Sequence, residues 1–108
     1  MSFIVKEGRR RRYIGFRINS KHSFQKSDLI LEIQKKCRNI FNKKYSEMGI
    51  FLIRFKDGEG IIRCNHIEKE NTIKLLKSID KITNYKVDII TLGTSGTIKS
   101  LVKKHMQN

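Results

Sequence analysis

Nine residues near the end of the chain, GTSGTIKSL from Gly93 to Leu101, combine glycines, hydroxyl side chains and a lysine directly after an apolar run. Free backbone N–H groups at a helix start commonly hold phosphate. A nucleotide-binding P-loop needs four residues between its glycines, followed directly by Lys and Ser or Thr. Here only two residues lie between Gly93 and Gly96, and Ile98 rather than glycine precedes Lys99. This pattern therefore does not predict a P-loop.

Two compatible interpretations of the stretch remain. The turn could contact a phosphate of a larger ligand, or it could only cap a helix through Thr94 or Ser95. For phosphate contact the candidate residues are Thr94, Ser95, Thr97, Lys99, Lys103 and Lys104. No acidic residue follows Asp88, so charge around the turn is entirely basic.

A second basic feature is the run of four arginines that precedes the first predicted strand. Arginine offers a planar fork of donors suited to phosphate. The run could also be a disordered solubilising tail, but its direct connection to a strand that carries a further arginine favours phosphate neutralisation. The candidate RNA-binding residues here are Arg9, Arg10, Arg11, Arg12 and Arg17.

Residues that could support autonomous catalysis or metal binding are sparse. Cys64 and His66 could supply two metal ligands, but nothing nearby completes a set of four. Asp57 and Glu59 fall in a predicted hairpin turn, where acidic residues are ordinary turn formers. We therefore predict no catalytic residue, no metal site and no cofactor bound by the protein itself.

The charge balance indicates a polyanionic partner. The 108 residues include 24 Lys and Arg against 10 Asp and Glu, a formal net charge of +14. Nucleic acid is the first candidate and an anionic membrane surface the second. No apolar run approaches the ~20 residues of a membrane span, and the first residues do not resemble a signal peptide. We expect a soluble, cytoplasmic protein.

The hydrophobic pattern predicts one domain, residues 13–108, behind a basic arm, residues 1–12. Strands are expected at 13–18, 50–55, 60–64 and 86–92, with an Asp57-Gly58 hairpin between the middle two. Amphipathic helices are expected from Ser27 to Phe41 and from Asn65 to Ile82, and a short third helix near 98–102. The order is a ferredoxin-like β-α-β-β-α-β sandwich, class α+β, with an additional C-terminal helix.

Both sheet faces are predicted to be largely apolar, although the two long helices can cover only one. Regular alternation from Ile50 to Phe55 would place Ile50 and Leu52 on the uncovered face, joined by Ile61. We predict that these three residues form a protein-partner surface, or that the third helix covers the face. Tyr13 and Phe16 lie on opposite faces and the third strand has no aromatic residue, so a base-stacking platform of the RNA-recognition-motif type is not favoured.

With these residues described, the chain resembles the archaeal ribonuclease P protein component 2 family. The matching stretches are RRRRYIGFRI, GIIRC and TLGTSGTIKSLVKK, in the family's order, over about Arg9 to Lys104. The resemblance implies an accessory subunit of the ribonucleoprotein that removes the 5′ leader of precursor tRNA. It further implies that catalysis and its Mg²⁺ reside in the RNA subunit, and that precursor tRNA is contacted only indirectly.

The resemblance also implies a partner protein, a second, barrel-like ribonuclease P subunit, in a pair or a heterotetramer. The alternative is a general RNA-binding protein of ribosome-associated type without a processing role. A third possibility is a protein-interaction module whose charge only confers solubility.

Overall fold

The computed structural model describes residues 10–106, so Arg9 of the arginine run lies outside the described residues. Its strands are β1 (Arg11–Asn19), β2 (Phe51–Lys56), β3 (Glu59–Asn65), β4 (Lys81–Ile82), β5 (Tyr85–Lys86) and β6 (Asp88–Ser95). Its helices are α2 (Lys26–Lys36), α3 (Lys69–Ser78) and α4 (Ile98–Leu101). A π-helical turn extends α2 over Cys37–Phe41, and another extends α4 over Val102–Met106. A 3-10 turn, His66–Glu68, precedes α3.

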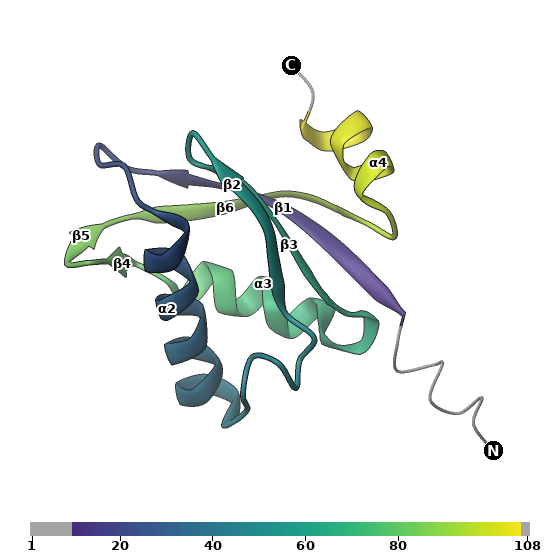
Figure 1. Ribbon diagram of the computed structural model, residues 1–108, viewed down its shortest axis with the longest axis horizontal. Coiled ribbons are helices and arrows are strands. Elements are labelled where there is room, and N and C mark those ends of the chain that lie inside the picture. The colour runs from purple at the N-terminus through teal and green to yellow at the C-terminus, as the bar shows by residue number, and fades with distance from the viewer. Residues whose placement is uncertain (1–9, 107–108) are drawn as a thin grey trace.

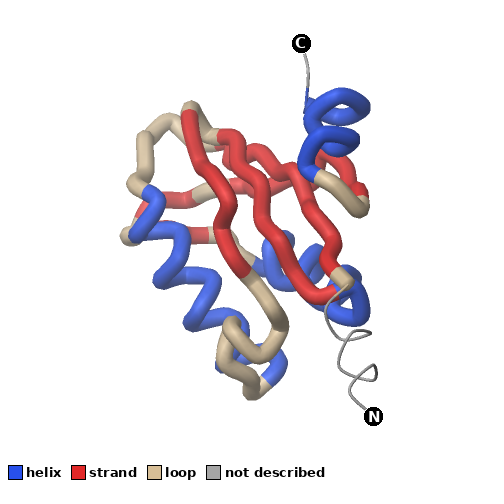
Figure 2. The backbone as a smooth tube through the Cα atoms, turned by 45° about the vertical axis from the view of Figure 1, so that its right-hand side comes forward, coloured by secondary structure: helices blue, strands red, loops and turns tan. Residues whose placement is uncertain are grey.

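Four strands form an antiparallel sheet in the order β2-β3-β1-β6, with α2 and α3 on one face (Figure 1, Figure 2). This arrangement is the predicted ferredoxin-like sandwich, and the prediction is confirmed. The main core lies between sheet and helices, with Phe16 and Ile62 from the strands meeting Leu29, Ile33 and Leu76 from the helices. The Asp57-Gly58 hairpin is also present, and both residues have positive φ, as its tight turn requires.

Strand β2 does not alternate regularly, and the predicted partner surface is wrong for this reason. The pairing of β2 with β3 shifts between Leu52 and Arg54, which leaves Ile53 as the extra residue of a β-bulge. Leu52 and Phe55 consequently both face the helices, although they are three residues apart. Ile50 and Leu52 are buried in the main core, so neither contributes to an exposed surface.

The C-terminal helix covers part of the opposite sheet face (Figure 1). Met106 packs directly over Gly15, where a Cβ would lie 2.7 Å from its sulfur. The ring of His105 likewise occupies the space over Gly93. Ile61 does lie on this face, opposite Gly15 in the ladder, but it is fully buried, as is Leu101 of α4. The expectation of a cover is therefore met by the third helix, and Ile61 is not an exposed partner residue either.

Most element boundaries shift by a few residues from the predictions, and three of the shifts change the role of named residues. Strand β1 starts at Arg11, so two arginines of the expected arm are strand residues. Helix α3 ends at Ser78, and the two-stranded hairpin of β4 and β5 follows, which keeps Ile79 and Ile82 buried without extending the helix. Strand β6 runs to Ser95, which makes Gly93 a strand residue opposite Gly15 rather than part of a turn.

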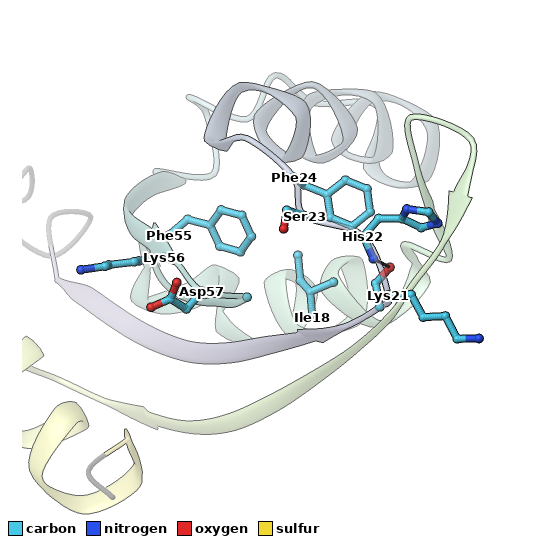
Figure 3. Close-up of a pocket in the computed structure, with 10 residues that line it drawn as sticks. Ile18, Lys21, His22, Ser23, Phe24, Phe55, Lys56 and Asp57 are labelled. Atoms are coloured by element: carbon cyan, nitrogen blue, oxygen red, sulfur yellow. Dashed lines mark hydrogen bonds between the residues drawn. The ribbon is translucent and has the colours of Figure 1, made fainter.

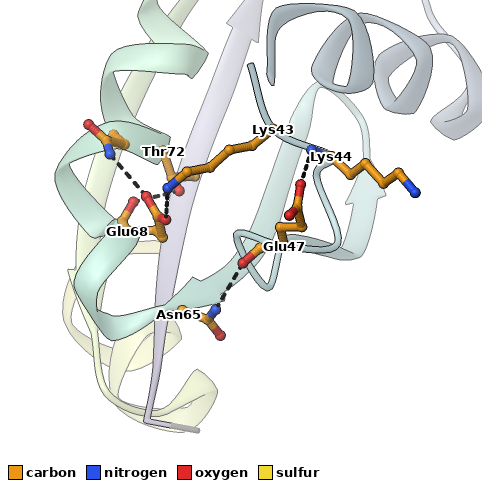
Figure 4. A network of polar contacts seen from close by, with 7 residues as sticks. Lys43, Lys44, Glu47, Asn65, Glu68 and Thr72 are labelled. Atoms are coloured by element: carbon orange, nitrogen blue, oxygen red, sulfur yellow. Dashed lines mark hydrogen bonds and ion pairs between the residues drawn. The ribbon is translucent and has the colours of Figure 1, made fainter. Parts of the chain in front are cut away.

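A polar network joins the segment after α2 to the start of α3 (Figure 4). Glu68 is 5% exposed, and its carboxylate accepts hydrogen bonds from Lys43 at 2.8 Å and Asn71 at 2.9 Å. Burial opposes the charge, but these two donors outweigh it and hold the pKa of Glu68 below its ordinary value. The hydrogen bond and charge of Glu68 raise the pKa of Lys43. The ion pair thus links the segment that follows α2 to the 3-10 turn that precedes α3.

Candidate nucleic-acid interface

One end of the sheet gathers five of the eleven predicted RNA-binding residues, namely Arg10, Arg11, Arg12, Ser95 and Thr97. The start of β1 lies beside the end of β3 and the end of β6, because both neighbours run antiparallel to it. Arg11 is opposite Asn65, and Tyr13 is opposite Ser95. We call this region, formed by residues 10–13, 63–69 and 95–97, the basic end.

The arginine run and the glycine turn meet at the basic end. A Cβ on Gly96 would lie 3.0 Å from Nη1 of Arg12, so the guanidinium group rests against the turn between β6 and α4. Arg10 is exposed, and its carbonyl accepts a hydrogen bond from the backbone N–H of His66 at 2.8 Å. Segments more than fifty residues apart in sequence therefore share one surface.

The hydroxyls of the glycine turn have local roles. Thr97 is the N-cap of α4 and accepts a hydrogen bond from the Ser100 N–H at 3.2 Å, while Ser95 accepts one from the Thr97 N–H at 3.4 Å. Thr94 is a strand residue paired with Ile14. The capping interpretation is thus realised, by Thr97 rather than by Thr94 or Ser95, and α4 is only four residues long.

The lysines of the C-terminal helix extend the positive charge. Lys99, Lys103 and Lys104 are all exposed, and they lie on the helix that covers the second sheet face. Arg17, in contrast, is not brought to the basic end. It lies in the other half of β1 and makes an ion pair with Glu59 at 2.9 Å, so part of its charge is already neutralised within the chain.

Two residues that sequence reasoning missed belong to this site, His66 and Lys69. Burial, and then the charges of Arg12, Arg10 and Lys69, lower the pKa of His66. Its buried Nδ1 has no hydrogen-bond partner among the described residues. The three cations that contribute to this lower pKa give the surface around His66 a positive charge, which favours the binding of an anion. The only sequence signal was the polar segment directly after the third strand.

Arg63 is a further residue that the sequence did not reveal. Its guanidinium lies over the ring of Phe51, 5.1 Å from the centroid, and it stands between Phe51 and Tyr13 in the ladder. An open hollow of about 430 Å³ adjoins this pair, lined also by Arg11 and Asn65, whose side chains are hydrogen-bonded at 3.2 Å. The second sheet face thus presents arginine and aromatic side chains close to the basic end.

The sequence model of the Rpp14/Pop5 family matches residues 12–106, which span nearly the whole described fold. The chain belongs to the Rpp14/Pop5 family. The resemblance to archaeal ribonuclease P protein component 2 is thereby confirmed.

Curated members of the family with this name align over most of the chain. The protein from Methanosarcina barkeri is 30% identical over 92% of this chain and 74% of its own length. The protein from Archaeoglobus fulgidus is 29% identical over 91% of this chain and 90% of its own length. That from Pyrococcus furiosus is 32% identical over 90% and 83%.

A chain in the cryo-EM structure of yeast ribonuclease MRP has the same fold. It superposes with a TM-score of 0.66 at 16% identity, covering 82% of this chain and 76% of its own length. In residues 10–106, no helix is long and apolar enough to cross a membrane. The same residues contain no group of three or more His, Cys, Asp or Glu side chains placed to hold a metal ion.

Proposed function

We propose that the chain is a protein subunit of ribonuclease P, the ribonucleoprotein that cleaves the 5′ leader from precursor tRNA. The family membership supports the assignment, and the convergence of Arg10, Arg12 and Lys69 around His66 supports the mechanism. In this proposal the basic end binds the RNA subunit and screens repulsion where its strands approach closely. The RNA, with its Mg²⁺, carries out the cleavage, and the protein supplies no catalytic group.

The glycine turn contributes to RNA binding mainly by position. Ser95 and Thr97 accept backbone hydrogen bonds that hold the turn, and they carry no charge, so we assign phosphate contact first to Arg10 and Arg12 and to the lysines of the C-terminal helix. Thr94 is a strand residue that precedes the turn, so its backbone N–H is not one of the free groups at the start of the helix. Pairing with a second ribonuclease P protein remains part of the proposal, but not through Ile50, Leu52 or Ile61, which the chain buries itself.

The decisive experiment is to isolate the tagged protein from its host and sequence the RNA that accompanies it. Ribonuclease P RNA supports the proposal. Ribosomal RNA would favour the general RNA-binding alternative, and the absence of RNA would favour a protein-interaction module.

A second experiment addresses the mechanism. The Arg10→Ala/Arg12→Ala double variant is compared with the parent chain in reconstituted cleavage of precursor tRNA over a range of Mg²⁺ concentrations. If the basic end screens RNA strands, the variant needs more Mg²⁺ for the same rate. An unchanged requirement in a correctly folded variant would contradict the assignment.

A further inference from the structure

A pocket of about 440 Å³ lies at the opposite end of the sheet, far from the basic end in the ladder (Figure 3). Its volume is in the range of small-ligand sites, ~300–1,000 Å³. Two connections meet there, the segment between β1 and α2 and the β2–β3 turn, together with the last residues of β1 and β2. The residues that line it are Ile18, Ser20, Lys21, His22, Ser23, Phe24, Phe55, Lys56, Asp57 and Gly58.

Two aromatic rings stand on different sides of this pocket, and each is braced from behind. Figure 3 shows Phe55 and Phe24 on either side of the space. The ring of Phe55 stacks on buried Phe16, with centroids 6.3 Å apart and planes 13° from parallel. The ring centroids of Phe24 and Tyr85 are 6.4 Å apart, and those of Tyr85 and His22 are 3.7 Å apart with the planes tilted by 30°. Both rings therefore have an aromatic neighbour before any ligand arrives, a buried one behind Phe55 and a half-exposed one beside Phe24.

The rim of the pocket is equally constrained. Asp57 and Gly58 form a tight turn with positive φ, and the Gly58 carbonyl accepts a 2.7 Å hydrogen bond from the Ile18 N–H. Ser20 accepts a hydrogen bond from the His22 N–H at 3.2 Å and donates one to the Lys86 carbonyl at 3.4 Å. A preorganised site loses little conformational entropy on binding.

Charge at the mouth indicates the kind of ligand. Lys21 and Lys56 extend away from the pocket on two sides (Figure 3), and neither forms an ion pair within residues 10–106. The hydroxyl of Ser23 lies between the aromatic walls, where it can donate or accept a hydrogen bond, whereas the carboxylate of Asp57 points outward on the side of Lys56 (Figure 3). A flat aromatic ligand with negative charge before and after it fits this arrangement of aromatic walls and flanking lysines.

We propose that this pocket receives one unstacked nucleobase of a bound RNA, with Lys21 and Lys56 holding the flanking phosphates. Phe24 and Phe55 provide the stacking surfaces, and the Ser23 hydroxyl donates to or accepts from the edge of the base. The inference rests on the RNA binding proposed above, but it concerns a separate site with different chemistry. Bases exposed in single-stranded loops are the parts of RNA that proteins stack on aromatic side chains.

The absence of tryptophan from the chain permits a direct test. Phe24→Trp places a single reporter in the pocket wall, and Leu31→Trp places one on the exposed side of α2 as the matched control. Each variant is titrated with short oligouridylate or oligoadenylate and with an abasic oligomer of equal length. Only base-containing RNA should quench the indole fluorescence of the Phe24→Trp variant. Equal quenching of both reporters, or quenching by the abasic oligomer, would overturn the proposal.

A second test separates this site from the basic end. Stacking releases no counterions, so Phe24→Leu should weaken binding to ribonuclease P RNA by about 5- to 150-fold per stacked base and leave the salt dependence unchanged. Arg10→Ala/Arg12→Ala should instead reduce the salt dependence. Normal affinity of a folded Phe24→Leu variant, with the arginine effect intact, would refute the pocket and leave the proposed function standing. If Phe24→Leu keeps normal affinity and Arg10→Ala/Arg12→Ala keeps the parent salt dependence, both the pocket and the RNA-binding role of the basic end are refuted.

Discussion

Removal of Arg10 and Arg12 should change the salt dependence of RNA binding by a predictable amount. Each phosphate contact contributes about −0.7 to −0.9 to the slope of log K against log salt. Two lost contacts should therefore flatten the slope by about 1.4 to 1.8. If the contacts act only by counterion release, affinity at about 0.15 M salt falls by roughly 14- to 30-fold, or about 1.5–2 kcal/mol.

The assay is a set of binding titrations with ribonuclease P RNA at several salt concentrations. The structure provides two controls. Lys77→Ala/Lys81→Ala removes the same charge from exposed positions at the end of α3 and in β4, and Arg12→Lys keeps the charge next to Gly96. The lysine pair should alter the slope little, and Arg12→Lys should retain it. Equal slopes for the two double alanine variants would show that net charge, not a local site, governs binding, and would refute the reasoning.

Three further predictions follow from the packing and the titrating groups. Leu52→Asp should abolish folding, because it leaves an unpaired charge in the main core; a cooperative thermal melt with loss of partner binding alone would contradict the face assignment. Leu101→Ala should lower the free energy of unfolding by about 2–5 kcal/mol. Hydrogen exchange measured by mass spectrometry should rise in residues 98–106 before it rises in β1. His66 should titrate in an NMR experiment below its ordinary 6.5. Because its folded pKa is lowered, stability should decrease as pH falls below 6.5, and a bound phosphate should raise the pKa of His66.

The fold was predictable because its signals are local. Leu29, Ile33 and Cys37 follow helical spacing, and Asp57-Gly58 marks the hairpin between two apolar strands. The strand faces were not predictable in the same way. The single extra residue, Ile53, moves each preceding residue of the strand to the opposite sheet face from the one predicted. Isoleucine is an ordinary strand residue, so the sequence does not indicate a bulge at this position.

The candidate site was predictable only in part. The arginine run and the glycine turn stand out as local patterns, and their basic character is a property of the sequence. The contributions of His66, Lys69 and Arg63 could not be predicted in this way, because isolated cationic or polar residues are common on any protein surface. Their role depends on neighbours that come from other strands.

The sequence by itself determined that the chain is strongly basic, that it forms a ferredoxin-like sandwich and that it resembles a ribonuclease P protein family. These properties follow from composition, hydrophobic period and ordered motifs, all of which are written along one dimension. The tertiary structure alone decided that Arg12 rests on Gly96, that Met106 of the C-terminal segment packs over Gly15, and that Phe24 and Phe55 line one pocket. Each of these depends on strand register and on the meeting of distant segments, which the free energy of packing fixes and no local spacing encodes.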